Sequence, residues 1–148
     1  MIQITSGSLN EVARHAESDY PYECCGLLLG EFLESSKSVA EIFPISNARE
    51  EAAKRNRFLI RPDELRRGEE YAKGRNLAVV GFYHSHPDHP AEPSQYDLEH
   101  AWPIYSYVIV SVKSGQVAAI RSWEQEFDRS RFTEEVLEVR EPAVSVAK

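Results

Sequence analysis

The sequence predicts a single α/β domain in which a mixed β-sheet is flanked by helices. Short runs of β-branched and aromatic residues alternate along the chain with segments of helical periodicity, which is typical of this class. Two pairs of these strand-like runs are separated only by a short polar turn, so the strands are not all parallel. A length of 148 residues suits one domain with one substantial core. We assign this domain to residues 1–140 and expect 141–148 to be a flexible C-terminal tail.

Each predicted element follows from a local pattern. Ile2–Thr5 has the alternation of a short strand, and Ser8 with Glu11 has the spacing of a capping box that opens a helix to about Ser18. Apolar runs bounded by Gly, Pro or polar turns give the other elements. In chain order these are paired strands Gly26–Phe32 and Val39–Ile45, a charged loop over 47–56, a short strand Phe58–Ile60, a helix from Pro62 to about Arg75, a strand Leu77–Tyr83, a helix from Ser94 to about Trp102, and a hairpin of Tyr107–Val112 and Val117–Trp123. Phe132–Val139 fits a strand and a helix equally well.

The chemically informative segment combines two histidines, a serine and an aspartate in the pattern H-x-H-P-x6-S-x2-D, from His84 to Asp97. Side chains two apart on a strand share a face, so His84 and His86 point the same way at the end of the predicted strand. Pro87 ends the strand ladder, and a Pro-rich loop follows. Ser94 then opens a helix as its N-cap, with Asp97 in the capping-box position, which returns a carboxylate toward the strand end.

Two imidazoles and one carboxylate form a ligand set suited to Zn²⁺. Three protein ligands of this kind leave a fourth position for water, as in catalytic zinc sites, so the pattern predicts a hydrolase. Taken singly, the two histidines fit a polar surface, and Ser94 with Asp97 fits a simple helix cap. Together, in the order strand, turn and cap, they favour a metal site. The same ligands would also accept iron or manganese, because selectivity depends on geometry and metal supply.

A hydrolase of this kind also needs a base, and the candidate lies upstream at Glu23. This single carboxylate precedes the apolar run that begins near Gly26. A charge at the mouth of a buried strand is costly unless it is paired, which favours a functional role. An exposed position at a loop tip would explain Glu23 equally well, so the residues alone leave both interpretations open.

The other reactive side chains predict no second site. We expect His15 to lie on the surface of the first helix, and His89 and His100 to be solvated or to lie behind the metal ligands. Cys24 and Cys25 have no separate His–acid pair to activate them, so we expect them to be reduced and buried.

Three separated segments carry a pattern that is more specific than any single motif. They are Pro21-x-Glu23-x-Cys25-Gly26-x-Leu28-x-Gly30, then Gly81-x-x-His84-Ser85-His86-Pro87, then Ser94-x-x-Asp97. Together they resemble the JAMM (MPN+) metallopeptidase family, and Phe58-x-Ile60-x-Pro62-x-Glu64-Leu65 is similar to the middle segment of that family. The resemblance spans residues 1 to 125 and fills every signature position.

The resemblance implies a zinc-dependent enzyme that cleaves peptide or isopeptide bonds after ubiquitin or ubiquitin-like proteins. It also implies one JAMM/MPN-like domain with a curved mixed sheet, similar to the cytidine deaminase architecture, and one zinc ion per chain. By this resemblance the zinc ligands are His84, His86 and Asp97. Glu23 is then the catalytic acid/base, and Ser94 stabilises the oxyanion.

The chain resembles a small, prokaryotic-type member of the family. The short stretch after Asp97 leaves little room for the insertions with which some members grip ubiquitin. We therefore expect a substrate that is a ubiquitin-like or sulfur-carrier protein, or its conjugates, cleaved after the C-terminal Gly-Gly. A metal-dependent hydrolase of other peptide or amide substrates and a non-catalytic MPN-type scaffold are the alternatives. The complete set of site residues argues against the scaffold.

Composition limits the expected partners and compartment. The formal net charge of −7 argues against a nucleic-acid surface, where a basic patch is expected. The sequence contains no apolar run of about 18 residues and no basic-then-apolar leader, so we expect neither a membrane span nor a secretory signal. Two adjacent cysteines make no disulfide framework, which favours the reducing cytoplasm. The sequence predicts no particular oligomeric state.

Overall fold

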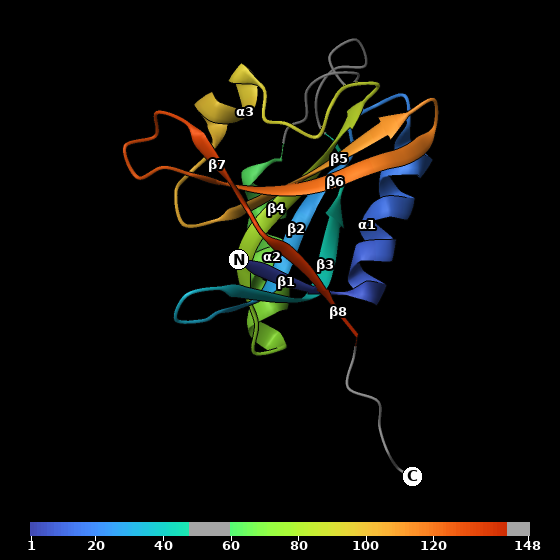
Figure 1. Ribbon diagram of the computed structural model, residues 1–148. Helices are drawn as coiled ribbons and strands as arrows, with labels where there is room; N and C mark the ends of the chain where they lie inside the picture. The colour runs from blue at the N-terminus through green and yellow to red at the C-terminus, as the bar shows by residue number, and fades with distance from the viewer. Residues whose placement is uncertain (48–59, 142–148) are drawn as a thin grey trace.

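The computed structural model describes residues 1–47 and 60–141, which form one curved, eight-stranded mixed sheet flanked by helices (Figure 1). The strand order is β7-β6-β5-β4-β2-β3-β1-β8. The elements are, in chain order, β1 (Ile2–Thr5), α1 (Ser6–Asp19), β2 (Cys25–Phe32), β3 (Lys37–Ile45), α2 (Pro62–Gly74), β4 (Ala78–Pro87), α3 (Gln95–His100), β5 (Ser106–Lys113), β6 (Gln116–Gln125), β7 (Phe132–Glu135) and β8 (Leu137–Arg140). The predicted α/β class is confirmed. Most of the predicted loop 47–56 and strand Phe58–Ile60, and the expected tail from 142 onward, lie outside the described residues.

The segment 132–140 joins the two edges of the sheet. β7 pairs antiparallel with the end of β6, and β8 pairs in parallel with β1. Only Val136 separates β7 from β8, and its carbonyl accepts a hydrogen bond from the Ile2 amide at 2.9 Å. Figure 1 shows this stretch, in red, crossing the front of the molecule. Phe132–Val139, for which the sequence allowed either a strand or a helix, is therefore extended.

Two apolar cores lie on opposite faces of the sheet, because successive strand residues point to opposite sides. Leu28 packs with Val12 and Ala16 of α1 on one face. Its neighbour Leu27 packs toward Ala72 of α2 on the other face. A fully buried aliphatic side chain contributes about 1.5–3 kcal/mol. The two helices therefore hold the central strands from both sides.

Strand β4 lies at the centre of the sheet and extends further than predicted. It pairs antiparallel with β2 and in parallel with β5. The ladder with β5 continues to Pro87, so β4 includes His84 and His86 instead of ending at Tyr83. A Cβ on Gly81 would lie 2.3 Å from a backbone oxygen of β5, so the close approach of these two strands requires glycine there.

The helix boundaries differ from the prediction at two points. Thr5 is the N-cap of α1, because its hydroxyl accepts a hydrogen bond from the Ser8 amide at 3.2 Å. The capping box predicted from Ser8 and Glu11 is therefore wrong, since a threonine at the end of β1 already caps the helix. α3 ends at His100, a little before the predicted end near Trp102.

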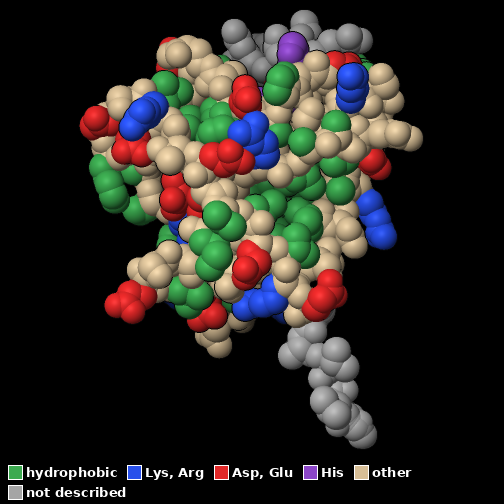
Figure 2. Space-filling view, in the orientation of Figure 1, with side chains coloured by type: hydrophobic (Ala, Val, Ile, Leu, Met, Phe, Trp, Pro, Cys, Tyr) green, Lys and Arg blue, Asp and Glu red, His purple; other side chains and the backbone are tan. Residues whose placement is uncertain are grey.

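The surface carries charges of both signs. On the face shown in Figure 2, Lys and Arg side chains are interspersed with Asp and Glu and form no continuous basic patch. Apolar side chains occupy the middle of the same face. None of the helices within residues 1–47 and 60–141 is long and apolar enough to cross a membrane.

Candidate metal centre

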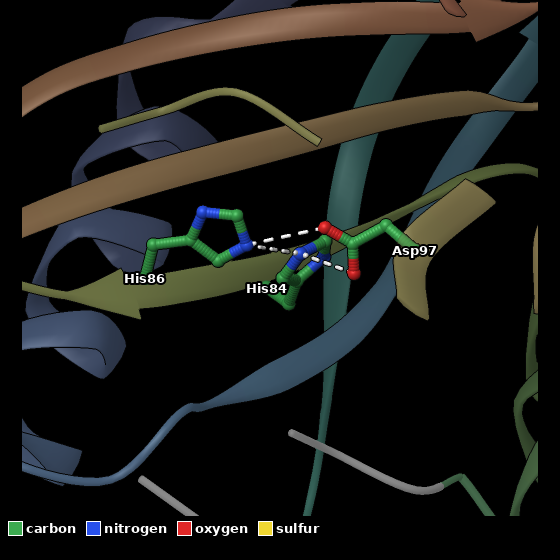
Figure 3. A group of neighbouring side chains, drawn as sticks. All are labelled: His84, His86 and Asp97. Atoms are coloured by element: carbon green, nitrogen blue, oxygen red, sulfur yellow. Dashed lines mark hydrogen bonds and ion pairs between the residues drawn. The ribbon is translucent and has the colours of Figure 1, made fainter. Parts of the chain in front are cut away.

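Two histidines from a strand and one carboxylate from a helix converge at the end of β4. His84 and His86 lie on the same face of β4, as their spacing predicts, and Asp97 reaches them from the first turn of α3 (Figure 3). The two Nε2 atoms are 3.1 Å apart. Asp97 Oδ1 lies 3.2 Å from His84 Nε2, and Asp97 Oδ2 lies 3.2 Å from His86 Nε2. The structure thus brings together the three ligands expected from the sequence.

This arrangement fits a tetrahedral metal ion. Zinc bonds to nitrogen and oxygen of about 2.0–2.2 Å place two tetrahedral ligands roughly 3.4 Å apart. The observed separations of 3.1 and 3.2 Å are close to that value. His84, His86 and Asp97 are 1%, 7% and 9% exposed. Burial alone would raise the pKa of Asp97, but the two imidazoles hold it well below its usual range, so this ligand is ionised.

The outer nitrogen of His86 is fixed by the loop that follows β4. Nδ1 of His86 donates a hydrogen bond to the Pro90 carbonyl at 2.9 Å. Because a carbonyl can only accept, a ring proton lies on Nδ1, and Nε2 faces His84 and the Asp97 carboxylate. Metal-bound histidines almost always have an outer partner of this kind.

Asp97 is held in place by the start of α3. Ser94 Oγ accepts a hydrogen bond from the Asp97 amide at 3.1 Å, and Asp97 Oδ2 accepts one from the Ser94 amide at 2.8 Å. The capping box predicted from the sequence is confirmed. The same local device that starts the helix therefore also orients the carboxylate. Ser94 itself is exposed and lines the cavity beside the cluster.

Glu23 reaches this cavity from a distant part of the chain. Cys24 is the residue just before β2. Its carbonyl accepts a hydrogen bond from the Ser85 amide at 3.2 Å, and its amide donates to Ser85 Oγ at 2.8 Å. These bonds continue the pairing of β2 with β4 by one residue and bring Glu23 level with His86. Glu23, His86 and Ser94 line one open cavity of about 450 Å³.

Burial controls the ionisation of Glu23, which is only 4% exposed. Burial raises the pKa of its carboxyl to about 8, with His86 lowering this pKa and Asp97 raising it by smaller amounts. A divalent cation bound at the cluster would lower the pKa again. The alternative in which Glu23 stays in water at a loop tip is therefore wrong. A buried carboxyl that titrates near neutral pH is suited to accept and return a proton.

The structure places the other histidines outside the cluster. His89 and His100 are exposed, and of these two only His89 lines the cavity. His15 is half-buried rather than on the surface as predicted, because its Nδ1 lies 2.7 Å from the Tyr83 hydroxyl oxygen. Cys24 is a free, buried thiol like its neighbour, as expected. Burial raises the pKa of the Cys24 thiol to about 12, which makes it a poor nucleophile.

Sequence reasoning missed two contacts that position the site. Ser85 binds the Cys24 amide, and the Pro90 carbonyl orients His86. A small hydroxyl residue between two histidines on a buried strand was the one available sign of the first contact. The second comes from a backbone carbonyl, which side-chain identity does not encode.

Comparison with known families agrees with this geometry. A family model described as prokaryotic homologs of the JAB domain matches residues 5–126. This chain belongs to the prokaryotic JAB domain family. The JAMM/MPN membership expected from the sequence is therefore confirmed. Desampylase from Haloferax volcanii is a relative that is 36% identical over 104 residues, covering 70% of this chain and 72% of that protein.

Solved structures share the fold of this JAB domain. A protein from Desulfitobacterium hafniense superposes with a TM-score of 0.84 at 28% identity, covering 96% of this chain and 94% of that chain. A JAB1/MPN domain protein from Archaeoglobus fulgidus superposes with a TM-score of 0.58 at 22% identity, covering 95% of this chain and 98% of that chain. This second likeness concerns the fold alone. The predicted single JAMM/MPN-like domain with a mixed sheet is confirmed.

The cap at the start of α3 can be tested by substitution. Ser94→Ala removes the acceptor for the Asp97 amide and should lower the free energy of unfolding by about 1 kcal/mol, measured by urea denaturation. Ser94→Thr keeps the hydroxyl and should lose much less. Equal unfolding free energies for the wild type and Ser94→Ala would show that the cap does not contribute to stability.

Proposed function

We propose that this chain is a zinc-dependent peptidase or isopeptidase that hydrolyses the amide bond after the C-terminal Gly-Gly of a ubiquitin-like protein. One observation carries the proposal: a buried carboxylate, Glu23, lines the same cavity as His86, a member of a buried N/N/O cluster. Such a combination suits metal-assisted hydrolysis of an amide. Similarity to desampylase, a protein named for the removal of a modifier, supports a protein modifier or its conjugates as the substrate.

His84, His86 and Asp97 would hold one zinc ion per chain. When bound, zinc lowers the pKa of a water molecule in its fourth position toward ~7. Metal binding requires neutral imidazoles and an ionised carboxylate. The hydrogen bond from Nδ1 of His86 to Pro90 leaves Nε2 as the nitrogen that would bind the metal, and the lowered pKa of Asp97 keeps its carboxylate ionised.

Glu23 would act first as general base and then as general acid. Its carboxylate, which shares the cavity with His86, would accept the proton of the attacking water and pass it to the leaving amine. This kind of transfer contributes about 10²–10⁴-fold to the rate. Ser94 Oγ accepts a hydrogen bond from the Asp97 amide. The O–H of Ser94 would therefore stay available to donate to the substrate carbonyl oxygen as negative charge grows there.

The surroundings of the site suit an extended protein tail. An apolar cavity of about 260 Å³ between α2 and α3 shares Tyr96 with the catalytic cavity. Its lining includes Leu65, Phe82 and Trp102. A tail that ends in Gly-Gly has no side chain next to the cleaved bond, so its backbone can approach the buried ligands closely. A ubiquitin-like or sulfur-carrier protein with such a tail is the partner that we propose.

We place this activity in the cytoplasm. The two buried cysteines are free thiols, which suits a reducing compartment. A hydrolase of other peptides or amides is the alternative, because ligands and base define the reaction class while substrate choice depends on the surrounding surface.

The substrate proposal is tested with a ubiquitin-like carrier fused through its Gly-Gly end to a reporter. Zinc-loaded protein should cut after the second Gly, as identified by mass spectrometry of the products. Chelator-treated protein should leave the fusion intact until zinc is added back. If zinc-loaded protein spares the fusion but cleaves unrelated peptides, the alternative substrate class is correct. A fusion ending in Ala-Ala is the matched substrate control.

Glu23→Gln keeps the size of the side chain and removes the proton acceptor. We expect the zinc content to stay at the wild-type level and the rate of cleavage to fall by at least about 10²-fold. Metal analysis and the reporter assay measure the two effects. Glu92→Gln, at an exposed carboxylate that lines the same cavity, is the matched control and should keep the wild-type rate. Full activity in Glu23→Gln would remove this residue from the proton transfer.

Asp97→Ala removes the only anionic ligand from the cluster. Zinc content after dialysis should fall from one ion per chain toward none, because two imidazoles alone form an incomplete site. Asp63→Ala, in the first turn of α2, provides a control for the loss of an acidic residue at a helix start. An Asp97→Ala variant that retains a full complement of zinc would show that Asp97 is not a ligand.

A further inference from the structure

The loop between the second histidine and the capped helix is held by side chains from three neighbouring strands. Ser111 Oγ of β5 donates to the His89 carbonyl at 2.6 Å. His86 Nδ1 of β4 donates to the Pro90 carbonyl at 2.9 Å. Trp123 Nε1 of β6 donates to the carbonyl of the next residue, Ala91, at 3.0 Å. Three consecutive backbone carbonyls therefore each accept a hydrogen bond from a different strand.

This pattern fixes the direction of the Pro90 carbonyl. Each peptide unit is planar, so anchoring a carbonyl anchors its whole peptide plane. Ser111 fixes the plane before Pro90, and Trp123 fixes the plane after Ala91. The ring of Pro90 also locks its own φ near −65°. With both flanking planes held and one dihedral fixed, the peptide plane between them has little freedom to rotate.

We infer that Ser111 and Trp123 are positioning residues for the metal ligand His86. Each side chain donates a hydrogen bond to a backbone carbonyl of the loop and acts through that loop. Their bonds hold the Pro90 carbonyl where it accepts a hydrogen bond from Nδ1 of His86, which keeps Nε2 facing the centre of the cluster. This inference rests on the proposed metal site and extends it to two strands that supply no ligand.

The bonds at the ends of the loop contribute less to this arrangement. The Asp88 carboxylate accepts hydrogen bonds from the Tyr20 hydroxyl and the Ser114 amide, and Arg121 pairs with Glu92 at 3.2 Å. Asp88 and Glu92 are exposed, and an exposed ion pair such as Arg121–Glu92 is typically worth less than about 1 kcal/mol. Ser111 is 8% exposed and Ala91 is 2% exposed, and the three central bonds are partly buried.

Two substitutions in the full-length protein test the inference. Ser111→Ala removes the hydroxyl, and Trp123→Phe removes the indole N–H while it keeps an aromatic ring. Each should weaken zinc binding by about tenfold, measured by competition with a chromophoric chelator. Each should also change the visible absorption spectrum of the cobalt-substituted protein, which reports ligand geometry. Ser111→Thr retains a hydroxyl and should restore the wild-type affinity and spectrum.

Matched controls separate positioning from a general loss of stability. Ser122→Ala removes a hydroxyl next to Trp123 that donates to the Glu135 carboxylate, and Trp102→Phe changes an indole that lies 4.5 Å from the Arg129 guanidinium. Both should bind zinc like the wild type. The melting temperature of each metal-free protein is measured in parallel.

The possible results are distinct. Wild-type affinity and spectrum in Ser111→Ala and Trp123→Phe would overturn the inference, even if their melting temperatures fall. Equal losses of affinity in the control variants would overturn it as well. A wild-type protein that holds no zinc would overturn the proposed metal site and this inference together, whereas zinc binding without cleavage would overturn only the proposed reaction.

Discussion

The site depends on the pairing of strand β4 with its two neighbours. β2 pairs with β4 in a fixed antiparallel register, which brings the segment of Glu23 beside His84 and His86, more than 60 residues later in the chain. β5 supports the other edge of β4 as far as Pro87. A slip of one residue would turn His84 and His86 to the face of α1 and separate them from Asp97. The apolar cores on both faces of the sheet oppose such a slip, because it would move the apolar side chains of β4 into the opposite core.

Burying the polar cluster lowers the stability of the folded protein. Glu23, His84, His86 and Asp97 occupy positions that are as buried as the apolar core. Since a domain is stable by only about 5–15 kcal/mol in total, such a cluster persists only where hydrogen bonds and opposite charges compensate for lost hydration. The reciprocal cap at Asp97 and the Pro90 contact of His86 provide part of this compensation. The remainder is what a bound cation would supply.

Local patterns predicted those parts of the structure that depend on neighbours in the sequence. The alternation around His84 and His86, and the capping box at Ser94, are encoded within a few residues and were predicted correctly. The extended path of Phe132–Val139, the cap at Thr5 and the contact of His15 with Tyr83 were not. Each of these three depends on an element that is distant in sequence or on competition between two nearby capping residues. The position of Glu23 required the sheet register, which the residues alone do not provide; family resemblance supplied it.

The way in which residues 132–140 connect β6 to β1 also determines when this protein can finish folding during its synthesis. Every residue of the cavity precedes this segment in the chain, so the ribosome releases them first. Until the last strand emerges, one edge of β6 and one edge of β1 lack their partners, and unpaired edges invite contact with other chains. Pairing of β7 with β6 and of β8 with β1 therefore completes the sheet. We expect the nascent chain to be most prone to aggregation after the residues of the cavity have been synthesised and before these two strands pair.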